Sequence, residues 1–314
     1  MKPIPIAIIG LGTHAKLAHI PSLDLTDAFR LVAVATSREQ TAREAASRYR
    51  VTAYAGYGEL LARADVEAVI VAGPSELHDG IVRAALERGK HVLVETPAVS
   101  EVSAARAVLE FAARRRLVVQ AGFVLRSAPP LECLRQFIQR QTGQRLLCFE
   151  YFPFLSHIYN LALHLAGPVQ EVLAATGSAA GRTAVLQHAN GDVSHVVGRA
   201  LANCSVDIES VRVSGAKFYA SVEGRRRVRL VEDMAPLPVE DWSSTSCGGL
   251  SYEPQPFAGR FLEASGCVPQ LRAFAQAIRE GVPPPSTLED AIATKELMQR
   301  IERVVHTERQ AATA

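Results

Sequence analysis

Continuous apolar runs alternate with amphipathic segments through the first 120 residues of the chain. The runs have the length and composition of strands buried on both faces, and the segments between them have helical spacing. Predicted strands cover residues 4–9, 29–35, 68–72, 91–94 and 117–120, and predicted helices cover 39–48, 57–64, 76–88 and 101–116. This alternation predicts an α/β domain whose parallel sheet carries helices on both faces.

The second half of the chain has a different pattern, in which strand-like runs follow one another directly. Predicted strands cover residues 145–152, 169–175, 184–188, 193–200, 206–213 and 218–223, and predicted helices cover 156–165, 270–279 and 286–307. A capping box at residues 286–289 (Ser-Thr-Leu-Glu) marks the start of the last helix. Residues 240–266, with Ser, Gly and Pro, are expected to be irregular.

These patterns predict two domains, residues 1–125 and residues 126–314. The second is expected to be an α/β domain with a mostly antiparallel sheet, whose C-terminal helices pack back toward the first domain. One face of that sheet has no predicted helix cover, which favours a homodimer or homotetramer assembled sheet to sheet.

A glycine-rich turn follows the first predicted strand, and its residues are Gly10, Leu11, Gly12, Thr13, His14 and Ala15. The first glycine permits a sharp turn, the second lets a diphosphate approach the backbone, and Ala15 lets helix and strand pack closely. The helix N-terminus adds free N–H groups and a partial positive charge. The alternative is a tight strand-to-helix turn with no ligand, but its position directly after a buried strand favours dinucleotide binding.

The second predicted strand ends in Thr36, Ser37 and Arg38. An acidic residue at this place would bind the free 2′-hydroxyl of NAD, and none is present. Two hydroxyls and a guanidinium suit a 2′-phosphate instead, so NADP(H) is favoured over NAD(H). The alternative is that Arg38 is only the exposed start of the next helix.

Composition narrows the class of protein. A net charge of +2 gives no electrostatic case for nucleic acid or an anionic membrane as partner. Five scattered cysteines without a C-x-x-C pair indicate neither a disulfide framework nor a zinc site, and no metal is expected. The N-terminus has no signal-peptide pattern, and no apolar run is long enough to cross a bilayer, so a cytoplasmic protein is expected.

Several motifs together resemble the glucose–fructose oxidoreductase/inositol dehydrogenase/MocA (Gfo/Idh/MocA) family. They are Gly10-Leu11-Gly12, Pro74 with His78, the run from Lys90 to Glu95 and Pro97, Gly122-Phe123 with Arg126 and Pro129, and residues 268–274, 280–283 and 288–291. The resemblance implies an N-terminal Rossmann domain, NAD(P)-dependent hydride transfer, and a substrate site facing that domain. It also implies a cis peptide before Pro97 and cofactor contacts from Gly73, Pro74, His78, Glu95, Thr96, Pro97 and Arg126.

The chain departs from the family where the proton is handled. Thr96 stands at the position of the family's E-K-P lysine. Alignment puts His157 on the family histidine, but Pro153 and Asn160 on its two aspartates. A threonine hydroxyl does not replace an ammonium as acid or base at neutral pH. Alcohol oxidation is therefore expected to be impaired, whereas an imine is basic enough to take its proton from a histidine, a tyrosine or water.

The thiazolinyl imine reductases of the same family also lack the lysine, and this chain is similar to them in that respect. We therefore expect reduction of a C=N or C=O carbon in a small molecule, free or carrier-bound, in a biosynthetic tailoring pathway. His157 is the first candidate proton donor, and Tyr151, Tyr159 and Thr96 complete the candidate catalytic group. His157 is equally well explained as a core histidine, and the tyrosines as packed aromatics.

Three other functions stay open at this point. The chain is alternatively a sugar or polyol dehydrogenase whose proton relay has moved, an enzyme that keeps the nucleotide for a non-redox reaction, or a nucleotide-binding protein without catalysis.

Overall fold

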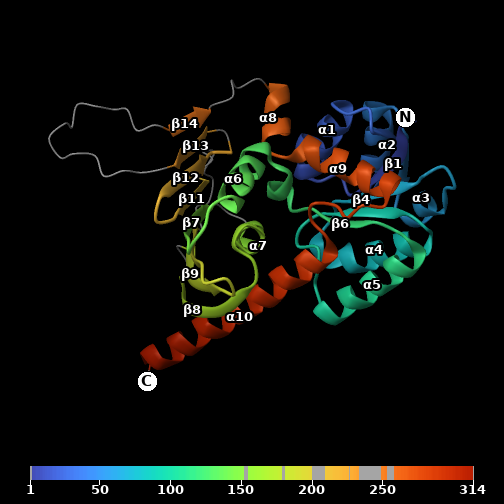
Figure 1. Cartoon of the computed structure of the whole chain (residues 1–314). Helices are drawn as coiled ribbons and strands as arrows, with labels where there is room; N and C mark the ends of the chain where they lie inside the picture. Colours follow the sequence, from blue (N-terminus) through green and yellow to red (C-terminus); the bar gives the residue numbers. More distant parts are fainter. Residues whose placement is uncertain are drawn as a thin grey trace. The chain divides into compact units, whose positions relative to one another are not determined.

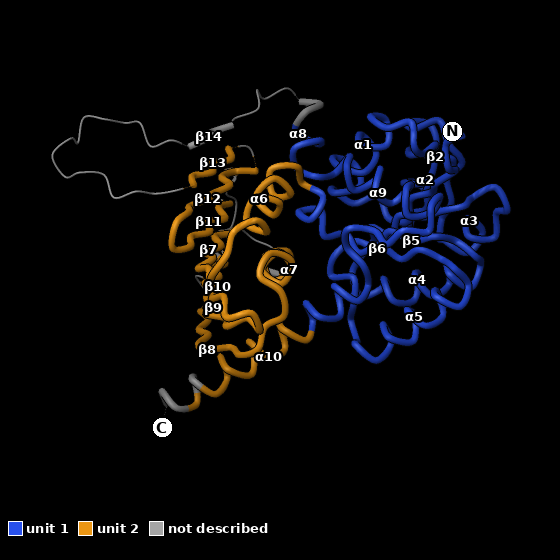
Figure 2. Tube along the Cα trace, viewed as in Figure 1, with its two compact units in different colours: residues 1–127, 258–295 blue, residues 128–257, 296–314 orange. Residues whose placement is uncertain are grey.

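The structure is a computed structural model that describes residues 2–151, 155–178, 181–199, 209–225, 227–232, 249–252 and 258–313. The chain divides into two compact units (Figure 2). Unit 1 comprises Met1–Ser127 and Ala258–Lys295, and unit 2 comprises Ala128–Phe257 and Glu296–Ala314. Each unit is built around one sheet.

Unit 1 contains a six-stranded sheet in the order β3-β2-β1-β4-β5-β6, with every neighbouring pair parallel. Its strands are β1 (Ile4–Ile9), β2 (Phe29–Thr36), β3 (Thr52–Ala55), β4 (Ala68–Val71), β5 (His91–Val94) and β6 (Val119–Ala121). The order reverses between β1 and β4, and such a switch point is where open α/β sheets bind ligands, beyond the carboxyl ends of the strands.

Helices cover both faces of this sheet (Figure 1). The helical segments of unit 1 are η1 (Ala15–His19), α1 (Ile20–Asp24), α2 (Glu39–Tyr49), α3 (Gly58–Ala62), η2 (Ser75–Leu77), α4 (His78–Glu87), α5 (Val102–Arg115), η3 (Val124–Ser127), α8 (Ala258–Ala264) and α9 (Cys267–Glu280). Alternate residues of β1 enter opposite cores, because successive strand side chains point to opposite faces. Ile6 and Ile8 pack with α1 and α9, whereas Ala7 and Ile9 share a core with α4 and α5.

Unit 2 contains an eight-stranded sheet in the order β14-β13-β12-β11-β7-β10-β9-β8. Its strands are β7 (Leu146–Tyr151), β8 (Val169–Ser178), β9 (Gly181–His188), β10 (Val193–Arg199), β11 (Ser210–Ser214), β12 (Phe218–Glu223), β13 (Arg227–Glu232) and β14 (Gly249–Tyr252). The pair β7–β10 is parallel and the other neighbouring pairs are antiparallel. The predicted fold class, a Rossmann domain followed by a mostly antiparallel α/β domain, is confirmed.

Two helices of unit 2 pack on this sheet, α6 (Pro129–Gln139) against β12 and β13, and α7 (Leu155–Ala166) against β7 and β10. Phe137 of α6 meets Phe218 edge to face, with ring centroids 5.8 Å apart. The last helix, α10 (Leu288–Thr313), begins in unit 1 and belongs to unit 2 from Glu296 onward. In the described part of the chain, no helix is both long and apolar enough to cross a membrane.

Three local predictions were wrong. Residues 258–264, predicted to be irregular, form α8, while residues 240–248 lie outside the described residues. The capping box of α10 is shifted by one residue: the Thr287 hydroxyl accepts from the Asp290 N–H, and the Asp290 carboxylate accepts from the Thr287 N–H. The Ser286 hydroxyl instead donates to the Ala121 carbonyl at 2.6 Å. Strands β3, β13 and β14 and helix α6 were not predicted.

Candidate active site

The two glycines of the turn after β1 differ in their surroundings. Gly10 has a φ of +97°, and a Cβ built on it would lie 2.4 Å from the backbone nitrogen of Gly73, which follows β4. Gly12 has no positive φ, and a Cβ there would meet only the Ala72 carbonyl oxygen, 3.9 Å away. The fold therefore requires glycine at position 10, whereas nothing in the described protein requires it at position 12.

The helix after this turn contains a π-helical turn, η1, in which the Ile20 N–H donates to the Ala15 carbonyl five residues earlier. Thr13 and His14 precede it at the exposed start of the helix, and Ala15 is fully buried. In an α-helix, residues five apart point about 140° away from each other. The π turn removes much of that rotation. It thereby brings His14 and His19 to one side of the helix.

Both histidines meet the carboxylate of Glu95, which follows β5. The His19 Nε2 lies 2.8 Å from Glu95 Oε1, and the His14 Nε2 lies 3.5 Å from the same oxygen. The two imidazole rings stand edge to face with centroids 5.0 Å apart. Burial would raise the pKa of Glu95, but its hydrogen bonds with His14 and His19 outweigh burial and hold the pKa below its ordinary value. Glu95 is therefore an anion at neutral pH.

The loop Glu95-Thr96-Pro97 is fixed from two sides. The Thr96–Pro97 peptide is cis, as the family resemblance implies. His78, at the start of α4, is buried; its Nδ1 lies 3.0 Å from the Pro97 carbonyl oxygen and its Nε2 3.0 Å from that of Gly73. The ring of His78 thus ties the loop after β4, where Pro74 follows Gly73, to the loop after β5.

Thr36, Ser37 and Arg38 lie at the end of β2, as predicted. The Thr36 hydroxyl donates to the Arg38 carbonyl at 2.8 Å, which closes the turn. Ser37 and Arg38 are exposed, and Arg38 has extended backbone directly before α2. This geometry is compatible with both interpretations of Arg38, as a phosphate-binding residue and as the exposed start of the helix.

Arg126 of η3 lies close to the start of α10. Its guanidinium is almost buried, lies 3.0 Å from the Asp290 carboxylate and donates to the Pro285 carbonyl. Burial lowers the pKa of Arg126, and the neighbouring carboxylate opposes that shift. These contacts show what Arg126 does for the fold, and its predicted cofactor contact stays a prediction.

The other candidate catalytic residues lie in unit 2, where Pro153 falls outside the described residues. His157 and Tyr159 are on α7, and Tyr151 is at the end of β7. The rings of His157 and Tyr151 stack at 27° with centroids 6.5 Å apart. Burial raises the pKa of Tyr159 to about 12, and its hydroxyl has no hydrogen-bond partner among the described residues. Asn160 is buried one turn from His157.

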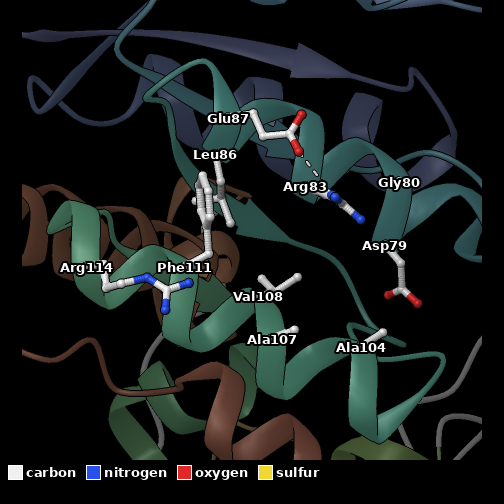
Figure 3. A pocket seen from close by; sticks show the side chains of 10 residues that line it. All are labelled: Asp79, Gly80, Arg83, Leu86, Glu87, Ala104, Ala107, Val108, Phe111 and Arg114. Carbon is white, nitrogen blue, oxygen red and sulfur yellow. Dashed lines mark hydrogen bonds and ion pairs between the residues drawn. The ribbon is translucent and has the colours of Figure 1, made fainter.

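A separate cavity of about 490 Å³ lies between helices α4 and α5 of unit 1 (Figure 3). Its lining residues are Asp79, Gly80, Arg83, Leu86, Glu87, Ala104, Ala107, Val108, Phe111 and Arg114. Arg83 is hydrogen-bonded to Glu87 on its rim. This lining includes no residue that the sequence assigned to the nucleotide or to catalysis.

His14 and Glu95 belong to motifs that the sequence shows, but His19 does not. The spacing of five residues between the histidines gives no sign of a shared helical face, since the π turn is visible only in the structure. The one sequence signal that joins His14 to Glu95 is that each follows a parallel strand at its carboxyl end.

Comparison with known proteins also indicates a dinucleotide-binding fold for the N-terminal part of the chain. Residues 4–123 match the model of the Gfo/Idh/MocA oxidoreductase family with an NAD-binding Rossmann fold. A dTDP-3,4-didehydro-2,6-dideoxy-alpha-D-glucose 3-reductase from Saccharopolyspora spinosa is 29% identical over 138 residues, 44% of this chain and 42% of that protein. The chain thus matches less than half the length of this curated relative.

Solved structures resemble the chain over its whole length. A dehydrogenase from Chromobacterium violaceum has a TM-score of 0.85 at 18% identity, covering 100% of this chain and 98% of that one. KijD10, a 3-ketoreductase from Actinomadura kijaniata in complex with TDP-benzene and NADP, has a TM-score of 0.74 at 20% identity, covering 96% and 97%. At these identities the likeness concerns the fold. The match to the Gfo/Idh/MocA oxidoreductase family therefore concerns the Rossmann domain that residues 4–123 form.

Proposed function

We propose that this protein is an NADPH-dependent reductase that delivers hydride to a C=N or C=O carbon of a small molecule. The difference between Gly10 and Gly12 is the observation that carries the proposal. Gly10 is explained by its φ and by Gly73, whereas Gly12 is exposed and lacks any such internal reason. A glycine that the fold does not need, at the switch point of a parallel sheet, is suited to close approach of a diphosphate.

The residues around this turn fit a dinucleotide. Gly10, Leu11, Gly12 and Thr13 would hold the diphosphate through the backbone, and Ser37 with Arg38 would meet the 2′-phosphate. Gly73, Pro74, Glu95, Thr96 and Pro97 would border the nicotinamide, with His78 holding their two loops together. NADPH supplies the hydride in such a site.

The substrate also needs a proton, on nitrogen for an imine and on oxygen for a ketone. Thr96 is a poor donor because its hydroxyl holds its proton at neutral pH. The phenol of Tyr159 holds its proton more tightly than a free tyrosine, since burial raises its pKa to about 12. We therefore assign the proton to His157, with Tyr151 stacked against the ring to fix its orientation.

Two substrate classes have specific support. The absence of an ammonium at Thr96 favours an imine, whose nitrogen is basic and needs only a weak acid. The relative from Saccharopolyspora spinosa is a 3-reductase of a nucleotide-linked keto sugar, which favours a ketone as the second candidate. Both classes accept hydride at carbon and a proton at the heteroatom. One assay of NADPH consumption can therefore compare the two substrates directly.

The deciding experiment follows NADPH absorbance at 340 nm with the full-length chain and two probes, a cyclic thiazoline imine and a dTDP-linked 3-keto sugar. Preferential consumption with the imine supports the first candidate, and preferential consumption with the sugar supports the second. Tight NADPH binding in a fluorescence titration, with no turnover of either probe or of a wider carbonyl and imine panel, would contradict the reductase proposal.

Replacing Arg38 by Ala is expected to lower the ratio of NADPH to NADH affinity by about tenfold or more, because a charge-assisted bond to the 2′-phosphate is lost. NADH binding itself should change little. The measurement is the Kd of each nucleotide by fluorescence titration. Arg43→Ala on the same helix is the matched control, because Arg43 is exposed and paired with Glu39. An unchanged ratio would mean that Arg38 only begins α2.

Replacing Thr96 by Lys is expected to leave the NADPH Kd within about threefold of the original and to raise ketone turnover relative to imine turnover. The reason is that an ammonium protonates a carbonyl oxygen far better than a hydroxyl does. The measurement is the ratio of kcat/KM for the two probes. Thr96→Met adds comparable length without charge and should not raise the ratio; loss of nucleotide binding in both variants would contradict the assigned position of this loop.

A further inference from the structure

We propose that His14, His19 and Glu95 form a binding site for one divalent transition-metal ion, best suited to Zn²⁺. These are three side chains from two separate stretches of unit 1, and their ligand atoms lie within 4.8 Å of one another. The spacing of cysteines and histidines in the sequence gave no indication of a metal. Glu95 and the turn that carries His14 are also assigned to the nucleotide in the proposed function, so metal binding is tested below without nucleotide.

The distances are close to those that a zinc ion needs. Zinc bound at about 2.0–2.2 Å by nitrogen and oxygen in tetrahedral geometry separates its ligands by roughly 3.3–3.5 Å. Glu95 Oε1 already lies 2.8 Å from His19 Nε2 and 3.5 Å from His14 Nε2. The ligand nitrogens of His14 and His19 lie within 4.8 Å of each other, so a rotation of the exposed His14 ring would bring all three ligand atoms around one ion. The ion would take the place of the protons that the imidazoles share with the carboxylate.

The donor set selects the class of ion. Two imidazoles with one carboxylate suit Zn²⁺ and its neighbours in the first transition row, whereas Mg²⁺ and Ca²⁺ prefer oxygen ligands throughout. Three protein ligands also leave one tetrahedral position for water or another small ligand. The arrangement therefore corresponds to an open zinc site rather than to a closed structural one.

The surroundings orient the ligands and leave a route for the ion. The second carboxylate oxygen of Glu95 accepts from the Thr96 N–H at 3.3 Å, and a Cβ on Gly122 would lie 2.9 Å from that same oxygen. Glycine at position 122 thus makes room for the carboxylate. His19 is buried and fixed, whereas the side chain of His14 is 52% exposed and reaches the ion from the solvent side. Such orientation of ligands by their neighbours is typical of metal sites.

The test is a calorimetric titration of ZnCl₂ into the chelator-treated full chain without nucleotide. We expect one high-affinity equivalent per chain. Affinity should fall by at least about 100-fold in His14→Ala and in His19→Ala, and His306→Ala, which changes an exposed histidine of unit 2, should bind as the parent does. His14→Ala keeps the result interpretable if the buried change at His19 impairs folding, because His14 lies at the surface.

Two results would overturn the proposal. One is wild-type affinity no higher than that of the His14→Ala/His19→Ala double variant, in which case the three residues are only a hydrogen-bonded cluster. The other is a strong near-ultraviolet charge-transfer band when Co²⁺ replaces Zn²⁺, which would assign the ion to cysteine thiolates. NADPH affinity is measured separately by fluorescence, so failure of the metal site and failure of the reductase proposal give different readouts.

Discussion

Gly12→Ala is expected to leave the fold intact and to weaken NADPH binding, whereas Gly10→Ala is expected to destabilise unit 1 itself. At position 12 the new methyl has 3.9 Å of clearance from the nearest protein atom, so any clash is with the ligand. Overpacking of about 1–3 kcal/mol corresponds to a roughly 5- to 150-fold higher Kd. Fluorescence titration with NADPH measures this change.

At position 10 the same methyl would lie 2.4 Å from the backbone of Gly73 on a residue with φ of +97°. The strained φ alone costs about 1–3 kcal/mol, and the backbone must also separate β1 from β4 at the switch point. We expect the melting temperature to fall by roughly 10 °C. Equal melting temperatures for the two variants would contradict this division of roles, and unchanged NADPH affinity in Gly12→Ala would remove the main support for nucleotide binding.

The different roles of Gly10 and Gly12 could be predicted from the sequence only in part. The apolar run of β1 followed by glycines predicts a strand and a tight turn, because few other local patterns place glycine directly after a buried strand. Which glycine serves the fold and which serves a ligand depends on Gly73, more than sixty residues away. Tertiary neighbours of that kind leave no trace in local periodicity.

Other features of the fold were also not predicted, because local composition or long-range packing hides them from the sequence pattern. β13 alternates exposed Arg227 and Arg229 with buried Val228, and so short and charged an alternation was not recognised as a strand. The helix α8 follows a Ser-, Gly- and Pro-rich stretch whose composition masks its start. The assignment of α9 to unit 1 rests on long-range packing, such as Phe274 stacked on Phe29 with centroids 5.7 Å apart.

The residues of the candidate site could likewise be predicted from the sequence only in part. Glu95, Thr96 and His14 are found from motifs, because each lies at a fixed place relative to a predicted strand end. His19 is not, since its contact with Glu95 depends on a π-helical turn within η1. The metal proposal could therefore come only from the structure, whereas the reductase proposal rests largely on the sequence.

His157→Phe is expected to slow the chemical step of imine or ketone reduction by about 100-fold or more, with little change in NADPH affinity. A general acid contributes typically 10²- to 10⁴-fold, and phenylalanine keeps the aromatic packing against Tyr151 while removing the proton. Nucleotide affinity should persist because the nucleotide-binding turn belongs to unit 1 and His157 to unit 2. Single-turnover kinetics at 340 nm measure the step directly.

Tyr159→Phe is the matched comparison on the same helix. Its hydroxyl is buried, has no hydrogen-bond partner among the described residues, and has a pKa raised to about 12 by burial. Removing such a group is expected to be neutral or slightly stabilising and to leave turnover within about threefold. If His157→Phe turns over normally while Tyr159→Phe loses activity, the proton comes from the tyrosine, and its orphaned hydroxyl is then the group that the substrate satisfies.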